Sequence, residues 1–244
     1  MKRSMVVAPE LRPLLRRLPL VPVDRAWARR LVRYVGRRLP TVDTPGVARE
    51  DPSAPVPGTR LYRPETRRGD GALLWIHGGG YVIGNVSMDD GLCGSTAREL
   101  GVPVLSVEYR LAPEHPFPAA LDDCHAGWAW LQEHARSLGF DPARVAVGGQ
   151  SAGGGLAAPY AVPARRADLG GLPPTWIGVG DIDLFHDEDR DYADRLRAAG
   201  VTTTFDVVPG APHGFETWAS RTAIARQHIA VAHDWLRQRL ISVA

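Results

Sequence analysis

The pentapeptide at 149–153, with the sequence GQSAG, is the segment of this chain whose residue types most clearly suggest chemistry. It follows an apolar stretch at 145–147 and precedes small residues that can open a helix. A serine on such a strand-to-helix turn projects above its sheet, where a base can reach the hydroxyl of Ser151. Glycine-rich turns before a helix also bind phosphates. The pentapeptide alone therefore predicts either a nucleophilic serine or a phosphate site.

A second glycine-rich segment, HGGG at 77–80, directly follows the apolar residues 73–76. Consecutive glycines leave backbone N–H groups open to a small ligand atom. In ester hydrolysis the substrate carbonyl oxygen becomes an oxyanion, which the N–H groups of Gly78, Gly79 and Ala152 could bind. A plain turn at the end of a strand is the alternative. The presence of both segments, in this chain order, favours an oxyanion hole.

A base and an acid follow later in the chain. His213 comes after a predicted strand at 203–208, and Asp183 comes after a predicted strand at 175–180. The order serine, acid, histidine is one of the known orders of a catalytic triad. In that arrangement His213 accepts the proton of Ser151, while Asp183 holds the imidazole tautomer and stabilises the imidazolium.

Other acids compete with Asp183 for this role. Asp181 is the main rival, and Asp187 and Glu188 are near. The last two are more typical of the first turn of a helix, where acidic side chains interact favourably with the helix dipole. Asp183 is preferred over Asp181.

The remaining histidines are expected to be structural or solvated, and His77 is expected to shape the glycine turn. They and the two cysteines show no spacing typical of a metal site, so no metal is expected. The histidines in question are His115, His125, His134, His186, His228 and His233.

Alternating strands and helices must position these groups. Strands are predicted at 60–63, 72–77, 102–107, 144–149, 175–180 and 203–208, with one edge strand within 40–58. Helices are predicted at 89–100, 118–137, 187–199 and 219–240. Such alternation indicates an α/β fold, a mostly parallel sheet with helices on both faces.

Two more helices are predicted before the first strand, at 8–18 and 24–38. In the second, Trp27, Leu31 and Val35 share one face. Arginines occupy the other face, namely Arg25, Arg29, Arg30, Arg33 and Arg37. This pattern is typical of a helix that lies on a lipid surface, or of a cap helix with a solvated face. The cap helix is preferred, because nothing else in the sequence requires a membrane.

Composition excludes several classes of protein. The 244 residues suit one α/β domain, and a formal net charge of +2 gives no reason to expect a nucleic-acid partner. Cys93 and Cys124 form no disulfide framework, which favours a reduced, cytoplasmic location. The first nineteen residues lack the apolar core of a signal peptide, and no stretch is long enough to insert stably into a membrane.

Taken together, the motifs resemble those of the hormone-sensitive-lipase-like family of α/β-hydrolases. The matching segments are HGGGY at 77–81, YRLAPEHPFPA at 109–119, GQSAGG at 149–154, GDID at 180–183 with DE at 187–188, and HGF at 213–215. They extend over most of residues 60–240. Gln150 stands where many members of the family carry Asp.

The resemblance implies a serine carboxylesterase that acts on short to medium acyl esters through an acyl-enzyme, without a cofactor. It places the triad on Ser151, Asp183 and His213, and the oxyanion donors on Gly78, Gly79 and Ala152. It also implies an N-terminal helical cap, residues 1–42, over a catalytic domain at 43–244. Amide or lactone hydrolysis by the same triad would differ only in substrate, and the fold does not choose among these.

One departure from the family is large. After Ala158 the end of the nucleophile helix, the next strand and its helix are expected to be missing. Only 32 residues separate Ser151 from Asp183, which barely accommodates one crossover of about 30 residues. Pro159 should also end or kink the helix that begins after Ser151. The fold is therefore expected to be one strand and one helix short.

The shortened sheet has consequences for the site. If the strand of Asp183 lay directly beside that of Ser151, the acid and histidine would shift by about 4.7–4.9 Å. The loops would then have to bend, or another chain would have to supply the strand, or the triad would be broken. Exposed apolar surface would also favour a homodimer. A catalytically impaired or ligand-binding relative is therefore the alternative to an active esterase.

Overall fold

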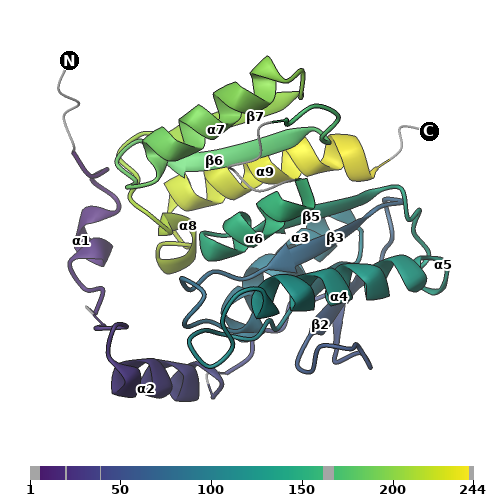
Figure 1. The fold of residues 1–244 in the computed structure, drawn as a ribbon, viewed down its shortest axis with the longest axis horizontal. Coiled ribbons are helices and arrows are strands. Elements are labelled where there is room, and N and C mark those ends of the chain that lie inside the picture. The colour runs from purple at the N-terminus through teal and green to yellow at the C-terminus, as the bar shows by residue number, and fades with distance from the viewer. Residues whose placement is uncertain (1–5, 20, 39, 162–167, 242–244) are drawn as a thin grey trace. The chain divides into compact units, whose positions relative to one another are not determined.

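The computed structural model describes residues 6–19, 21–38, 40–161 and 168–241. The chain divides into two compact units. We call residues 21–160 with 236–244 the larger unit, and residues 1–20 with 161–235 the smaller unit. Figure 1 shows the elements of both along the chain. No helix among the described residues has the length and apolar character needed to cross a bilayer.

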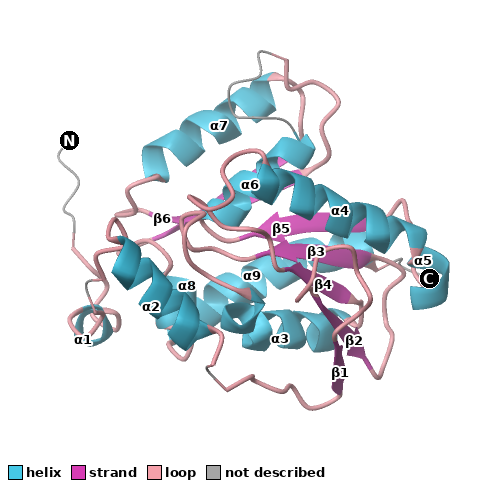
Figure 2. Ribbon diagram, turned by 60° about the horizontal axis from the view of Figure 1, so that its bottom comes forward, coloured by secondary structure: helices cyan, strands magenta, loops and turns pink. Residues whose placement is uncertain are grey.

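The larger unit contains a five-stranded mixed sheet (Figure 2). In spatial order its strands are β1 (Val47–Glu50), β2 (Arg60–Pro64), β4 (Val104–Val107), β3 (Ala72–Ile76) and β5 (Val145–Gly149). The first two pairings are antiparallel, and β3 pairs in parallel with both β4 and β5. The carboxyl ends of β3 and β5 therefore lie at the same edge of the sheet.

Helices cover both faces of this sheet, because alternate side chains of each strand point to opposite faces. Leu73 and Val104 pack with Cys93 and Ala97 of α3 (Asp90–Leu100). A short 3-10 helix at Val86–Asp89 leads into α3. On the other face, the strand residues Leu74, Ile76, Leu105 and Val107 pack with α4 (Ala119–Glu133), α5 (Ala135–Leu138) and α6 (Ala152–Ala161). These two clusters form the core of the larger unit.

The smaller unit is built on two parallel strands, β6 (Thr175–Gly180) and β7 (Thr203–Val208). Helix α7 (His186–Ala198) packs on this pair through Leu196, next to Ile177. A second cluster joins α1 (Arg12–Leu15), α8 (Phe215–Trp218) and α9 (Ala223–Leu240). The last helix belongs to the smaller unit up to Trp235 and to the larger unit from Leu236 onward.

The predicted strands are all present, and the edge strand expected within 40–58 is β1. Several helix predictions were wrong in length. The helix predicted at 8–18 has only the four residues of α1, and the one at 24–38 is α2 (Ala26–Gly36). The helix predicted at 118–137 is interrupted at His134, and the last helix begins at Ala223 rather than at 219.

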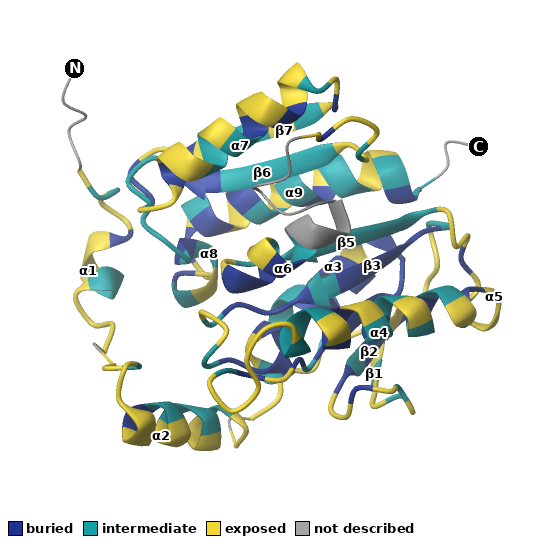
Figure 3. Cartoon of the chain, viewed as in Figure 1, coloured by how far each residue is buried: buried dark blue, intermediate teal, exposed yellow. Residues whose placement is uncertain are grey.

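The expected shortage of one strand matches the hydrogen bonding. Among the described residues, β5 pairs only with β3, and β6 pairs only with β7. Pro159 does not end α6, which continues to Ala161. As an edge strand, β5 is only half-buried along its whole length (Figure 3). In contrast, β4 is buried throughout. The sheet of the larger unit therefore ends at the strand that precedes Ser151.

Candidate active site

Ser151 occupies a tight turn between β5 and α6. Its φ angle is 52°, in the left-handed region that non-glycine residues rarely adopt. Gln150 N donates to Ile76 O at 3.3 Å, and Gly153 N donates to Gln150 O at 2.8 Å. These bonds hold the turn against the end of β3. Ser151 is exposed. Backbone strain of this kind clusters at functional sites.

Close approach of the backbone explains the glycines on either side of this serine. A Cβ atom on Gly149 would lie 2.8 Å from Ile76 O, and one on Gly153 would lie 2.6 Å from His77 O. Real Cβ atoms do not come so close to a carbonyl oxygen, so both positions require glycine.

The glycine loop after β3 lies beside the serine turn. A Cβ atom on Gly78 would be 3.6 Å from Ser151 Cβ. Gly79 has a φ angle of 116°, which an L side chain rarely adopts, and a Cβ there would overlap Ile83 O. The structure thus brings together Gly78, Ser151 and Ala152 within the larger unit.

His77 supports this loop and does not titrate near neutral pH. The side chain is buried, stacks on Tyr109 with ring centroids 4.1 Å apart, and donates from Nδ1 to Gly78 O at 2.7 Å. Burial lowers its pKa to about 4, although the bond to Gly78 opposes that shift. A neutral, fixed imidazole fits the structural role expected from the sequence.

Asp183 and His213 form a hydrogen-bonded pair in the smaller unit. His213 Nδ1 donates to Asp183 Oδ2 at 2.8 Å, and Asp183 Oδ1 accepts from Phe185 N at 2.9 Å. The Asp183 side chain is 7% exposed and that of His213 is 36% exposed. Both follow the carboxyl ends of parallel strands, β6 and β7, where open α/β sheets bind ligands.

The two groups shift each other's pKa. The hydrogen bond that His213 donates to Asp183 raises the pKa of His213, and this outweighs the opposing effect of burial. Burial alone would raise the pKa of Asp183, but the hydrogen bonds from His213 and Phe185 N together hold it below its ordinary value. The carboxylate is therefore ionised at neutral pH, as an acid that orients a histidine must be.

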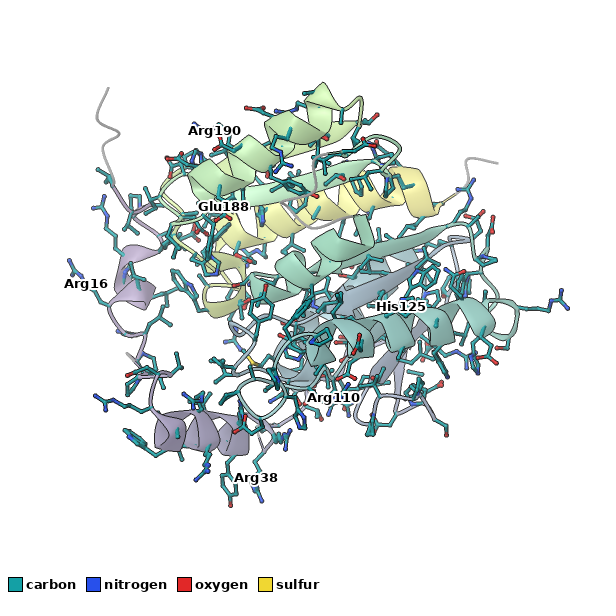
Figure 4. The ribbon with its side chains drawn as sticks, in the orientation of Figure 1. Arg16, Arg38, Arg110, His125, Glu188 and Arg190 are labelled. Atoms are coloured by element: carbon teal, nitrogen blue, oxygen red, sulfur yellow. The ribbon has the colours of Figure 1, made fainter. Side chains whose placement is uncertain are left out.

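The rival acids have other partners or positions. Asp181 Oδ1 accepts from Gly210 N at 2.6 Å and so ties the end of β6 to the loop that leads to His213. Asp187 and Glu188 are exposed in the first turn of α7. Figure 4 marks Glu188 at this helix. Among the acids considered from the sequence, the structure brings Asp183 into hydrogen bonding with the Nδ1 atom of His213.

Three further side chains near His213 were missed by the sequence analysis. The Phe185 ring meets the imidazole edge-on with centroids 5.2 Å apart, and Trp218 Nε1 donates to His213 O at 3.0 Å. Burial and the charge of Asp183 raise the pKa of Asp189 to about 6.

Other histidines pack as structural residues, as expected. His134 stacks on Trp130 with centroids 4.1 Å apart. His228 is buried between Trp176 and Phe215, with Nδ1 3.4 Å from Asp206 Oδ2.

Comparison with known proteins agrees with this fold and these motifs. A family model described as alpha/beta hydrolase fold matches residues 73–167 and 158–217. Carboxylic ester hydrolase LipN of Mycobacterium tuberculosis is 30% identical over 243 residues, covering 71% of this chain and 64% of LipN. Ethyl acetate hydrolase of Pseudomonas putida is 50% identical over 101 residues, covering 40% of this chain and 32% of that protein. A solved structure titled bacterial heroin esterase has a TM-score of 0.87 and 32% identity, covering 97% of this chain and 99% of the other.

The chain belongs to the hormone-sensitive-lipase-like family of α/β-hydrolases. It spans less than two thirds of LipN and of ethyl acetate hydrolase. The LipN alignment is 243 residues long yet takes in only 71% of the 244 residues here, so part of LipN has no counterpart in this chain. The two blocks of the family match overlap at residues 158–167. This is where the sequence predicted a missing segment, directly after Ala158.

Proposed function

We propose that this chain is a carboxylic-ester hydrolase in which Ser151 is the nucleophile, His213 the general base and Asp183 the acid that orients it. The observation that carries the proposal is the left-handed turn at Ser151 beside the Gly78 loop. The hydrogen bond between Asp183 and His213 supports the remaining roles.

The reaction would proceed through an acyl-enzyme. His213 Nδ1 donates to Asp183, so Nε2 is the atom that would take the proton of Ser151 as its oxygen attacks the ester carbonyl. The backbone N–H groups of Gly78, Gly79 and Ala152 would bind the oxyanion. His213 would then protonate the departing alcohol and activate the water that hydrolyses the acyl-enzyme. Besides the ester and water, these reaction steps require only residues of the chain.

Small esters with short to medium acyl groups are the proposed substrates. The names of the relatives support an ester over an amide or lactone, since they include a carboxylic ester hydrolase, an ethyl acetate hydrolase and a carboxylesterase. Cys93 and Cys124 are buried and free, which fits the proposed reduced, cytoplasmic location. Residues 1–42 are proposed to form the cap, because Arg33 of α2 binds the carbonyl oxygen of Val82 in the loop that continues from Gly79.

A catalytically impaired relative is the second candidate, and the edge position of β5 favours it. The strand that precedes Ser151 has no hydrogen-bonded neighbour beyond it among the described residues. In a working triad the donor and acceptor atoms lie about 2.6–3.2 Å apart. Loss of the strand could therefore prevent His213 from reaching Ser151.

Hydrolysis of p-nitrophenyl butyrate distinguishes the two candidates. The purified chain should turn over the ester, and Ser151→Ala should abolish turnover while circular dichroism shows both proteins folded. A fluorophosphonate should label the wild type, label His213→Ala far more slowly, and leave Ser151→Ala unlabelled. A folded wild type with neither turnover nor labelling would establish the impaired relative.

A further inference from the structure

Helix α2 packs on the larger unit through its polar side. Arg33 Nε donates to Val82 O at 2.8 Å, and its Nη2 donates to Ala112 O at 2.6 Å. Arg33 Nη1 also bonds to Glu114 at 2.9 Å. Ala28, toward one margin of this packed side, is only 1% exposed. These contacts fix how α2 is rotated about its axis.

The apolar side of α2 consequently faces outward (Figure 3). Trp27 is 63% exposed, Leu31 53%, Tyr34 57% and Val35 47%. Residues three and four apart lie on one helix face, so these four side chains form a continuous stripe. The usual surface helix of a globular protein has the opposite orientation, with its apolar stripe toward the core.

Arginines border this stripe. Arg30, Arg37 and Arg38 are exposed, and Figure 4 marks Arg38 next to the end of α2. The Arg38 guanidinium carbon lies 3.6 Å from the centroid of the Tyr34 ring. Neither Arg30 nor Arg37 forms an ion pair with any described residue, and Asp24 is the only acidic residue between positions 21 and 38. The stripe is thus apolar at its centre and positively charged at its margins.

We propose that α2 docks this protein onto an anionic phospholipid surface, with the helix parallel to the membrane and the stripe of Trp27, Leu31, Tyr34 and Val35 in the interface. Tryptophan and tyrosine prefer the headgroup level of a bilayer, and flanking arginines bind anionic headgroups. The inference does not depend on the proposed esterase activity.

Charge complementarity favours lipid over a second copy of this chain. In a symmetric dimer the same patch meets itself, which would oppose arginine to arginine across the contact. Like charges facing each other across an interface disfavour association. An anionic bilayer offers both an apolar layer for the stripe and negative charge for its margins.

Vesicle sedimentation tests the proposal. The full chain should pellet with vesicles of 30% phosphatidylglycerol in phosphatidylcholine, and far less with pure phosphatidylcholine. Salt at 0.5 M should weaken the binding, because screening shortens the reach of the arginine charges. Ser151→Ala should bind vesicles like the wild type. A failure of the proposed esterase activity is therefore distinguishable from a failure of membrane binding.

Two paired variants separate the roles of the stripe and of its margins. Trp27→Gln with Leu31→Gln, and separately Arg30→Gln with Arg37→Gln, should each weaken partitioning. Each arginine near an anionic surface contributes about a fivefold change in binding, so the arginine pair should cost roughly 25-fold. Matched controls are Phe117→Gln, which alters an 86% exposed ring outside α2, and Arg221→Gln with Arg226→Gln. Both controls should bind like the wild type.

Three results would overturn the proposal. The first is that folded wild-type protein does not bind anionic vesicles. The second is that the α2 variants and the control variants reduce binding equally. The third is a dimer in size-exclusion chromatography that Trp27→Gln with Leu31→Gln converts to monomer, which would assign the stripe to a second copy.

Discussion

Two hydrogen bonds fix the Asp183 carboxylate between a backbone amide and the imidazole of His213. Asp183→Asn would keep the shape but favour the wrong histidine tautomer, so kcat should fall by about 10⁴. Steady-state hydrolysis of p-nitrophenyl butyrate measures this. Asp181→Asn is the control: it weakens the bond to Gly210 N and should lower stability more than turnover. Equal losses of kcat in both variants would contradict the assignment of the acid.

The pH dependence of turnover should report the raised pKa of His213. In the proposed mechanism the imidazole must be neutral to accept the serine proton. Asp183 first, with Glu216 and Asp189 after it, stabilises the cation against the opposing effect of burial. The acidic limb of kcat/KM should therefore lie above 6.5, the ordinary pKa of histidine, with activity rising as pH increases through it.

Removal of Asp189 should move this limb. Asp189→Asn takes away a negative charge that favours the imidazolium, so the limb should shift to lower pH with little change in the plateau. A pH–rate profile from pH 5 to 9 measures the shift. Glu133→Gln, an exposed change on α4, is the control and should leave the profile unmoved. A limb that stays in place in Asp189→Asn would mean that Asp189 has no influence on His213.

At the scale of elements, the turn from β5 to α6 depends on a close backbone approach. A Cβ atom on Gly153 would overlap Ile76 O, so Gly153→Ala must displace α6 from the end of β3. Forced repacking of this kind typically costs about 1–3 kcal/mol, and displacement of Ser151 should also abolish turnover. Urea unfolding and ester hydrolysis measure the two effects.

Gly91→Ala provides the matched control for that change. Gly91 lies in α3, and a Cβ there would meet only Val42 Cγ1, at 3.8 Å, which is an ordinary contact. Replacing glycine by alanine inside a helix should stabilise by up to about 1 kcal/mol. A Gly153→Ala protein as stable and active as Gly91→Ala would disprove the tight packing of the turn.

The elements also show what sequence periodicity can and cannot predict. Apolar runs predicted central strands such as β3 and β4, which are almost entirely buried, because a buried strand needs only local composition. The two faces of α2 were also predicted, but the preferred interpretation, a solvated arginine face, was wrong at Arg33, whose side chain is only 16% exposed. Arg33 binds the carbonyl oxygens of Val82 and Ala112, which are distant in sequence, so periodicity did not reveal which face packs. The helix predicted at 8–18 ends at Leu15, and no feature of the sequence indicated this as clearly.

At the scale of the whole molecule, the halves of the candidate site could be predicted separately. GQSAG and HGGG form one local group in the larger unit, and Asp183 with His213 forms another in the smaller unit. Short motifs reveal such groups because each follows the end of a strand. How the groups combine depends on the strands between them, and there this chain departs from its relatives.

The two thiols should report opening of the larger unit. Cys93 on α3 and Cys124 on α4 pack on opposite faces of the sheet, and both are buried. Burial raises the pKa of both, that of Cys124 to about 12. Since the thiolate is the reactive form, a disulfide reagent such as DTNB should modify neither thiol in the native state at pH 8.

Urea should expose the thiols in step with the loss of secondary structure. Both should then react with DTNB in one transition that coincides with the change in circular dichroism. Rapid reaction of either thiol in native protein would show that one face of the sheet opens on its own.

The end of α9 has a consequence for biosynthesis. Leu240 packs beside Leu100 and Val102, and its carbonyl oxygen accepts from Gly71 N at 3.0 Å, just before β3. The central sheet, whose strands lie between residues 47 and 149, is thus completed by a segment that is translated well after its last strand. While the chain grows, the strands leave the ribosome before the end of α9 can pack beside them. A stop codon just before Leu240 would therefore act on strands made long before it.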